Sequence, residues 1–295
     1  AMDTLDAMRT FLAVADRRSF AAAARDLRLS AAAVTRAVAM LEDDLGTSLL
    51  HRTTRAVRLT ERGALYAERC RALLSDHDDL RAAVRGEDAV PRGRLSVTAP
   101  VVFGRLHILP VAEALADRYD TLDIRLTFLD RVTHLVEEGF DLAVRIGTLS
   151  DSAMIAVRLS EVRRVVVASP AYLAEHGLPM SPDDLRNHRI VSFDGVGATD
   201  EWRFGTDGKT GVRVAPRLSV NMAEAAIDAA ARGGGLTRVL SYQVAEHLAG
   251  ASLQVVLEDA EPPPIPVSLV YPASRRASAN VQAFVREARQ WFARR

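Results

Sequence analysis

The chain has 295 residues, 48% of them hydrophobic and 26% charged, which is the composition of a globular protein with room for two or three domains. Because 38 Lys and Arg residues balance 38 Asp and Glu residues, no global charge favours nucleic acid or membranes, and any basic surface must be local. The single cysteine excludes an internal disulfide, and the lack of a long apolar run or signal-peptide pattern predicts a cytoplasmic protein without a membrane span.

Three helices are predicted in the first 46 residues. The apolar face of the first consists of Leu5, Met8, Phe11, Leu12 and Ala15. Ser19 and Ser30 stand where N-cap residues would begin the second and third helices, and Gly46 suits the end of the third. The apolar face of the third consists of Val34, Val38, Leu41 and Leu45. Two short helices joined by a tight turn indicate a helix-turn-helix, whose second helix enters the DNA major groove.

The start of this third helix carries small side chains on its polar side. Small residues let a helix N-terminus lie deep in the groove, where its N–H groups favour a phosphate. Thr35 can offer a methyl group to thymine or a hydroxyl to a base edge, and Arg36 can bind guanine or a phosphate. The candidate reading residues are Ser30, Ala31, Ala32, Thr35 and Arg36. The alternative is a plain core helix, which the alanine content alone would favour.

The stretch from Leu49 to Gly63 has alternating apolar residues on both sides of an arginine-bearing turn, the pattern of a two-stranded wing. We expect this wing to meet the sugar-phosphate backbone beside the third helix. The residues assigned to that contact are Arg52, Thr53, Thr54 and Arg55. The wing favours the DNA-binding interpretation over the core helix.

A long helix is predicted from Thr60, as its N-cap, to about Arg85, and residues 86–94 then form a hinge. Steps of four and three residues give a narrow stripe of Tyr66, Cys70, Leu73, His77, Leu80 and Val84. Such a stripe on a charged helix is typical of a dimerisation seam. Packing of the stripe against the chain's own domain is the alternative, and a buried seam cysteine is more often a small hydrophobe than a redox sensor.

From Leu95 onward, short strands alternate with helices, which predicts an α/β fold with a parallel sheet. The expected strands are 95–99, 124–128, 141–146, 163–169, 190–193, 212–220 and 266–271. The expected helices are 103–119, 132–139, 223–232 and 279–294. The glycines of residues 233–235 are interpreted as a helix end that turns into a strand.

Ligands of open α/β sheets bind at the carboxyl ends of strands. That rule gives the effector-binding candidates Thr98, Pro100, Val101, Val102, Asp130, Arg145, Ile146, Phe193, Asn221, Met222 and Thr237. Arg145 either receives a carboxylate of the ligand or forms an ion pair with Asp130 or Asp194. The mixed apolar and polar set suits a small organic molecule, with an anion as one option.

The stretch "SFAAAARDLRLSAAAVTRAVAMLEDDLGTSLLHRTTRAVRLTERG" closely resembles the winged N-terminus of LysR-type transcriptional regulators. The similarity extends over the whole chain through "FDLAVRIG", "VRRVVVASPAYLAEHG", "ARGGGLTRVLSYQVAEHL" and "VSLVYPASRRASANVQAFV". The recognition helix departs from the family at Ala31 and Ala32, where many members have Gln-Pro or Gln-Ser, and Pro100 stands where members often have a hydroxyl residue.

The resemblance implies a winged helix-turn-helix, a linker helix that pairs with its twin, and two Rossmann-like lobes of type 2 periplasmic-binding-protein architecture. The implied domains are 1–60 for DNA binding, 61–88 for the linker, and 89–295 for effector binding, with lobe I at 92–161 and 266–295 and lobe II at 162–265. It also implies a homodimer or homotetramer that binds promoter DNA and a small effector.

An enzyme is the rival class of function. The seven histidines show no metal-ligand spacing, and the sequence has no G-x-S-x-G elbow and no G-x-x-x-x-G-K-[ST] phosphate loop. We therefore expect no catalysis, no metal and no cofactor. A solute-binding protein with a helical adaptor is a further alternative, which would need a signal peptide. The hypothesis is a repressor or activator of transcription whose action a small effector modulates.

Overall fold

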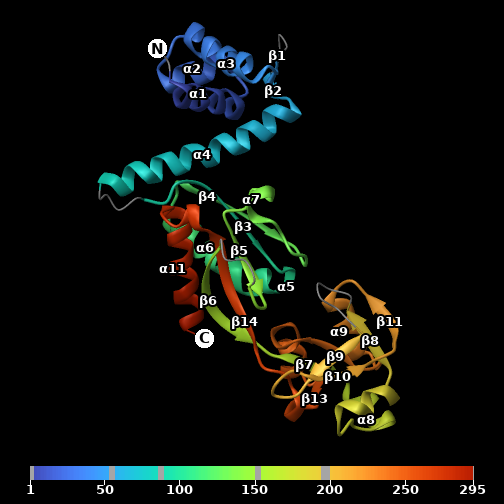
Figure 1. Cartoon of the computed structure of the whole chain (residues 1–295). Coiled ribbons are helices and arrows are strands. Elements are labelled where there is room, and N and C mark those ends of the chain that lie inside the picture. Colours follow the sequence, from blue (N-terminus) through green and yellow to red (C-terminus); the bar gives the residue numbers. More distant parts are fainter. Residues whose placement is uncertain (1–2, 53–56, 86–89, 150–153, 194–199, 295) are drawn as a thin grey trace. The chain divides into compact units, whose positions relative to one another are not determined.

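The structure, a computed structural model, describes residues 3–52, 57–85, 90–149, 154–193 and 200–294 (Figure 1). The chain divides into two compact units. The first contains residues 1–95, 119–123 and 274–283, and the second contains residues 96–118, 124–273 and 284–295. Across the described residues, no helix has the length and apolar character that a membrane crossing requires.

The N-terminal head consists of α1 (Thr4–Arg17), α2 (Phe20–Leu27) and α3 (Ala31–Leu45), followed by a wing. The predicted caps are confirmed. The Ser19 Oγ accepts a hydrogen bond from the Ala22 N–H at 3.2 Å, and the Ser30 Oγ accepts one from the Ala33 N–H at 3.1 Å. Gly46 ends α3 with a φ of +62°, a left-handed conformation that favours glycine.

The core of the head differs from the predicted apolar faces at two places. Leu45 is 41% exposed, because the last turn of α3, residues 43–46, is exposed on every side. In α1, only Phe11 of the five predicted residues is fully buried. The buried face of the helix is rotated by one position from the predicted face. The buried face consists of Ala7, Thr10, Phe11 and Val14. Val34, Val38 and Leu41 are buried as predicted.

The wing is the antiparallel pair β1 (Leu50–Arg52) and β2 (Val57–Leu59), and the linker helix α4 spans Glu61–Arg85. Thr60 caps α4 as predicted, since its Oγ1 accepts a hydrogen bond from the Gly63 N–H at 2.8 Å. Gly63 is required by close packing. A Cβ at this position would lie 1.9 Å from the Leu49 carbonyl oxygen, which is a backbone atom that cannot move aside.

Lobe I is built on a five-stranded sheet with the order β4-β3-β5-β14-β6. The strands are β3 (Gly93–Ala99), β4 (Leu122–Phe128), β5 (Leu142–Ile146), β6 (Met154–Val162) and β14 (Ile265–Pro272). One helical run comprises α5 (Val101–Phe103), a π-helical turn (Gly104–Ile108) and α6 (Leu109–Arg118). The end of α6 and α11 (Ala279–Ala293) lie side by side, joined by an Arg118–Glu287 ion pair at 2.7 Å (Figure 1).

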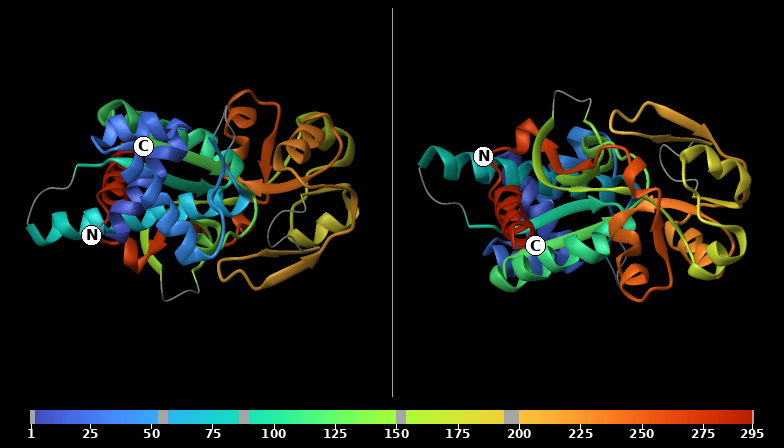
Figure 2. Two further views of the ribbon diagram at one scale, coloured as in Figure 1. Left: turned by 90° about the horizontal axis from the view of Figure 1, so that it is seen from above. Right: turned by 90° about the horizontal axis from the view of Figure 1, so that it is seen from below.

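Lobe II forms a separate group of elements, at the orange and yellow end of the views in Figure 2. Its strands are β7 (Arg164–Ala168), β8 (Ile190–Phe193), β9 (Glu201–Phe204), β10 (Thr210–Arg213), β11 (Pro216–Val220), β12 (Thr237–Leu240) and β13 (Gln254–Val256). Its helices are α8 (Pro170–His176), α9 (Ala223–Ala231) and α10 (Ala245–Ala249), with short 3-10 turns at Pro182–Asn187, Ser241–Val244 and Glu258–Ala260. A further 3-10 turn, Ala273–Arg275, follows β14.

The predicted parallel sheet is wrong in part, because the sheets are mixed. β3 runs parallel to β5, and β8 runs parallel to β11. β14 instead runs antiparallel to both β5 and β6, and β12 and β13 run antiparallel to β7. β14 returns to lobe I after the whole of lobe II and lies between β5 and β6, so its direction is set by long-range pairing and not by a β-α-β crossover.

Two predicted elements have different bounds. The strand expected at 212–220 is two strands, β10 and β11, which belong to different sheets. The helix expected at 132–139 is only α7 (Leu135–Glu138), because the Glu138 carboxylate accepts a hydrogen bond from the His134 N–H at 2.9 Å and starts the helix there. The prediction missed β6, α8, β9, α10 and β13. The turn from α9 through residues 233–235 into β12 is confirmed.

Candidate nucleic-acid interface and effector site

The residues predicted to read DNA lie together on the exposed side of α3. Ser30, Ala31 and Ala32 are exposed at its start, and Thr35 and Arg36 are exposed one turn later. The opposite side of the same turns holds the buried residues Val34, Ala37 and Val38. The head therefore supports α3 from behind and leaves its first two turns open to solvent.

The Thr35 hydroxyl is already engaged. Its Oγ1 donates a hydrogen bond to the Ala31 carbonyl oxygen, one turn back along α3, at 2.9 Å. In this conformation Thr35 therefore presents its methyl group and an oxygen lone pair rather than a free donor. Of the two contacts expected for Thr35, the geometry favours the methyl contact, or acceptance of a hydrogen bond, over donation to a base edge.

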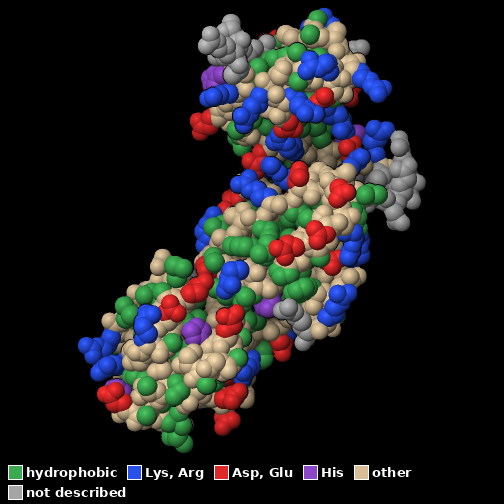
Figure 3. All heavy atoms as spheres, turned by 180° about the vertical axis from the view of Figure 1, so that it is seen from behind, with side chains coloured by type: hydrophobic (Ala, Val, Ile, Leu, Met, Phe, Trp, Pro, Cys, Tyr) green, Lys and Arg blue, Asp and Glu red, His purple; other side chains and the backbone are tan. Residues whose placement is uncertain are grey.

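Of the wing residues expected to contact the DNA backbone, Arg52 is the last residue of β1. Thr53, Thr54 and Arg55 lie outside the described residues, as does the side chain of Arg52. Arg58, on β2, is exposed. On the face of the head seen in Figure 3, Lys and Arg side chains are more numerous than Asp and Glu side chains.

The first two positions of the dimerisation stripe are covered within the same chain. The Tyr66 ring packs on Phe11 of the same chain, with ring centroids 5.6 Å apart, and Cys70 is 2% exposed. Burial raises the pKa of Tyr66 to about 12 and also raises the pKa of the Cys70 thiol, which makes that thiol less reactive. This contact within the chain is the alternative that the sequence left open, and it favours Leu73, Leu80 and Val84 as the exposed part of the stripe.

The later positions of the stripe remain open to a partner. Leu73 is 48% exposed, Leu80 61% and Val84 80%. His77 is half-buried, and its Nδ1 lies 3.6 Å from the Asp78 Oδ1. The dimer seam stays a prediction for this half of α4, and residues 86–89 of the expected hinge lie outside the described residues.

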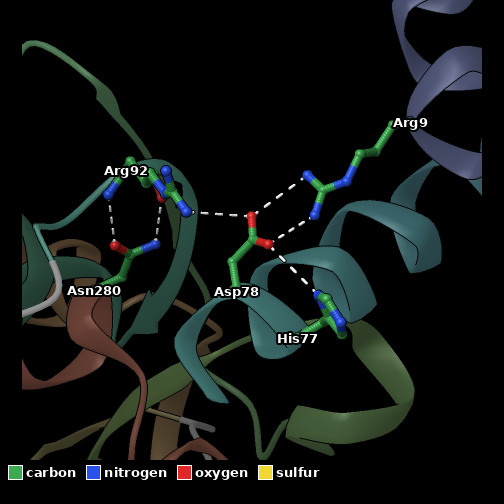
Figure 4. A network of polar contacts seen from close by, with 5 residues as sticks. All are labelled: Arg9, His77, Asp78, Arg92 and Asn280. Atoms are coloured by element: carbon green, nitrogen blue, oxygen red, sulfur yellow. Dashed lines mark hydrogen bonds and ion pairs between the residues drawn. The ribbon is translucent and has the colours of Figure 1, made fainter. Parts of the chain in front are cut away.

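A polar network that the sequence analysis missed centres on Asp78 (Figure 4). The Asp78 carboxylate accepts hydrogen bonds from Arg9 on α1, at 2.7 and 3.4 Å, and from Arg92, just before β3, at 3.3 Å. Asn280 at the start of α11 holds the Arg92 backbone, accepting from its N–H at 2.9 Å and donating to its carbonyl oxygen at 2.8 Å. No sequence signal marks these partners, because 69 residues separate Arg9 from Asp78 and 188 separate Arg92 from Asn280.

The same helix carries two further ion pairs. Arg71 bonds Asp16 of α1, and Arg275 bonds Asp76. Burial alone would raise the pKa of Asp78, but the hydrogen bonds and charge of Arg9, with the charge of Arg92, outweigh it and hold that pKa below its ordinary value. Ion pairs therefore join α4 to α1, through Arg9–Asp78 and Arg71–Asp16, and to the segments of Arg92 and Arg275.

The candidate effector residues fall into three groups by burial. Thr98, Val102 and Thr237 are buried, whereas Asp130, Asn221 and Met222 are exposed. Those of intermediate burial are Pro100, Val101, Arg145, Ile146 and Phe193. The Thr237 Oγ1 is fully enclosed and has no hydrogen-bond partner among the described residues. A buried hydroxyl without a partner is costly, and a ligand oxygen or nitrogen could supply the missing bond.

Of the alternatives for Arg145, the ion pair with Asp130 is not formed in the described chain. Arg145 donates instead to the Thr133 carbonyl oxygen and, at 3.3 Å, to the Thr133 Oγ1. Asp130 accepts a hydrogen bond from the Val101 N–H at 2.9 Å and so anchors the start of α5. Burial lowers the pKa of Arg145, and Glu138 opposes that effect. Asp194, the other expected partner, lies outside the described residues.

Comparisons with known proteins cover both parts of the chain. A family model described as a bacterial regulatory helix-turn-helix protein of the lysR family matches residues 5–64, and one described as a LysR substrate binding domain matches residues 88–293. An HTH-type transcriptional repressor of Pseudomonas aeruginosa is 36% identical over 99% of this chain and 93% of its own length. The HTH-type transcriptional regulator DmlR of Escherichia coli is 34% identical over 98% and 94%.

Solved structures agree with the family models. CrgA, a LysR-type transcriptional regulator from Neisseria meningitidis, superposes with a TM-score of 0.61 at 27% identity, over 97% of this chain and 98% of that one.

Proposed function

The chain belongs to the LysR family of bacterial transcriptional regulators, and from that premise we propose which of its residues bind DNA, sense the effector and join two copies. It is a DNA-binding regulator with an effector domain of the substrate-binding type. The observation that carries the proposal is the burial pattern at the start of α3. One side of the helix has small, exposed side chains, and the opposite side is buried in the head.

DNA recognition is assigned to the first two turns of α3. Ser30 caps the helix, and the short side chains of Ala31 and Ala32 allow the helix end to approach a phosphate, which the helix dipole favours. Thr35 presents its methyl group toward thymine, and Arg36 reaches a guanine or the next phosphate. The wing residues Arg52, Thr53, Thr54 and Arg55 are assigned to the neighbouring backbone.

The effector is assigned to the carboxyl ends of the strands in both lobes. The buried Thr237 hydroxyl supports this assignment, because it has a hydrogen-bonding capacity that nothing in the described chain satisfies. The apolar members of the set suit the body of a small organic molecule. Thr98, Asn221 and Arg145 add polar groups that could orient it, including a carboxylate if the effector is an anion.

Self-association is assigned to the exposed half of the α4 stripe, Leu73, Leu80 and Val84. A homodimer built on this stripe would carry two heads to a pseudo-palindromic site, and pairs of dimers would give the homotetramer. The domain bounds proposed are 1–60, 61–88 and 89–295. The relatives are named as transcriptional regulators, and we propose that this chain acts without catalysis, in the cytoplasm, where the promoter DNA lies.

A gel-shift experiment tests the DNA assignment. The probe is the intergenic DNA upstream of the gene, titrated with the full chain and with R36A and R55A. Both variants should bind at least tenfold more weakly, because each removes a charged contact to DNA. R186A, which removes an exposed arginine of lobe II paired with Asp183, is the matched control and should bind like the parent. Parental binding by both R36A and R55A would show that the assigned face is wrong.

A further inference from the structure

Two arginines of lobe II, Arg164 on β7 and Arg238 on β12, project from the same face of the β12-β7-β13 sheet. β7 and β12 are antiparallel, with Arg164 opposite Leu240 and Val166 opposite Arg238. Residues that face each other across a ladder point to the same side, so Arg164 and Arg238 are diagonal neighbours on one face, with Cβ atoms about 7 Å apart. Guanidinium groups at the ends of such side chains can reach a common point.

The Arg238 guanidinium is held in place by its surroundings. Its Cζ lies 5.0 Å from the centre of the Trp202 ring, a distance typical of a cation–π contact, and Trp202 itself is buried. The Arg238 Nη1 also donates to the Arg203 carbonyl oxygen at 3.4 Å. These two contacts orient the planar fork before any ligand arrives, which lowers the entropy cost of binding.

The charge of this pair is not balanced within the described chain. There, no ion pair joins a carboxylate to Arg164 or Arg238, and two acids close to the adjacent residue Arg163 are bonded to Arg163 itself. Arg163 forms ion pairs with Glu258 at 2.9 Å and with Glu261 at 3.3 Å. Burial lowers the pKa of Arg238, and the positive charge of Arg164 lowers it further. Although Arg164 is exposed, partial burial lowers its pKa as well.

We propose that Arg164 and Arg238 form a binding site for a small oxyanion, the carboxylate or phosphate group of a metabolite. Two guanidinium forks match the paired oxygens of such a group, and an anion between them removes the repulsion of two like charges. The site consists of only two arginines, which favours a small ligand over a protein partner.

This site is distinct from the assigned effector residues. Thr237 and Arg238 are consecutive on β12, so their side chains point to opposite faces of the sheet. Thr237 pairs with Val167, which packs in the core with α9, whereas Arg238 pairs with Val166, which packs in the core with Trp202. A ligand at the arginine pair therefore binds the other side of lobe II and could act together with the effector.

Trp202 supplies a local reporter. The chain has two tryptophans, so the full-length W291F variant keeps Trp202 alone. Sodium phosphate and, separately, sodium acetate are titrated at constant ionic strength in a zwitterionic buffer. At least one anion should change the Trp202 fluorescence saturably, and calorimetry on the parent chain should give the same midpoint.

Substitutions decide whether the arginine pair is responsible. R164Q, at an exposed position, should raise the apparent Kd at least tenfold, and R238K, which keeps the charge but loses the planar fork, should raise it similarly. R186Q removes an exposed arginine from the same lobe and should bind like the parent. A lack of saturable change with both anions, or parental binding by R164Q, would overturn the proposal and leave Arg238 as a packing partner of Trp202.

Discussion

Arg9 on α1 and Asp78 on α4 form a paired hydrogen bond, Nη2 to Oδ1 at 2.7 Å and Nη1 to Oδ2 at 3.4 Å, and the same carboxylate also receives Arg92. One side chain of the linker helix therefore holds both the head and the segment that leads into β3 (Figure 4). Asp78 therefore joins three parts of the chain, although its position on a charged helix suggests only an exposed side chain.

Replacing Asp78 by Asn should weaken both contacts, since a neutral amide accepts more weakly from arginine than a carboxylate does. Because Arg9 is partly exposed and the pair is screened, we expect a loss of about 1 kcal/mol in the free energy of unfolding. Urea unfolding of the full chain measures it. Glu68 lies exposed on the same helix, and E68Q should change the free energy by less than about 0.5 kcal/mol.

The same pair has a pH signature. Although burial opposes them, Arg9 and Arg92 hold the pKa of Asp78 below its ordinary value, so its stabilisation is fully present above the unfolded pKa of about 3.9 and is lost as pH falls through the folded pKa. The difference in unfolding free energy between the parent and D78N should be constant from about pH 7 to 5. It should shrink below about pH 4, and a difference that grew on acidification would contradict the assignment.

Gly63 should tolerate no side chain. A Cβ there would meet the Leu49 carbonyl oxygen, so G63A must shift the wing or α4 and should cost about 3 kcal/mol or more. Gly46 is the matched comparison. It has open space around its missing Cβ, so G46A pays only for the left-handed φ, about 1 kcal/mol. Equal losses in chemical denaturation would show that crowding at Gly63 is unimportant.

Ser30 allows helix capping to be separated from DNA binding. S30A removes the acceptor of the Ala33 N–H and should cost about 1 kcal/mol of stability, whereas S30D keeps a cap and should restore it. The aspartate would nevertheless repel a phosphate at the helix end. We therefore expect S30D to fold like the parent but to bind the intergenic DNA more weakly than S30A, and the reverse order of affinities would remove the phosphate from this position.

Arg36 can be assigned to a base or a phosphate by salt titration. If it binds a phosphate, R36A should reduce the slope of log K against log salt concentration by about 1 and weaken all sequences equally. If it binds guanine, discrimination at one base pair should fall by about 1 to 3 kcal/mol with a smaller change in slope. Binding curves at four salt concentrations, on specific and scrambled DNA, give the answer.

Leu80 and Leu65 of α4 are exposed to a similar degree, 61% and 59%, so that one can serve as the control for the other. Only Leu80 belongs to the predicted seam. L80D should therefore raise the dimer dissociation constant at least tenfold, because it places a charge in an apolar interface, while L65D should sediment like the parent. Sedimentation velocity across a range of protein concentrations distinguishes them, and unchanged assembly of L80D would refute the seam.

Local signals made the head predictable. Serine caps, a glycine stop and a polar turn between apolar residues act over a few positions, and each has one dominant structural meaning. The heptad stripe was less informative, because the same spacing describes a seam between two chains and packing within one. Tyr66 contacts Phe11 of its own chain and Cys70 is buried, whereas Leu80 is exposed, and nothing in the sequence distinguishes these positions.

Long-range pairing could not be predicted. The position of β14 between β5 and β6 depends on residues more than 100 positions apart, and its antiparallel direction cannot be read from local alternation. The candidate site shows the same limit. Strand ends located the effector candidates, yet among the described residues Arg145 bonds the Thr133 carbonyl oxygen, an acceptor that no local pattern marks.

The insertion of β14 has a consequence for synthesis on the ribosome. Lobe I begins with β3 near residue 93 but lacks an inner strand until residues 265–272 emerge, whereas the head is complete once α4 has formed. At ~5–20 residues per second, translation leaves a delay on the order of ten seconds or more between the two events. The DNA-binding head of a nascent chain is thus complete before the effector domain has formed. Truncation late in the message would yield a protein that binds DNA but does not respond to the effector.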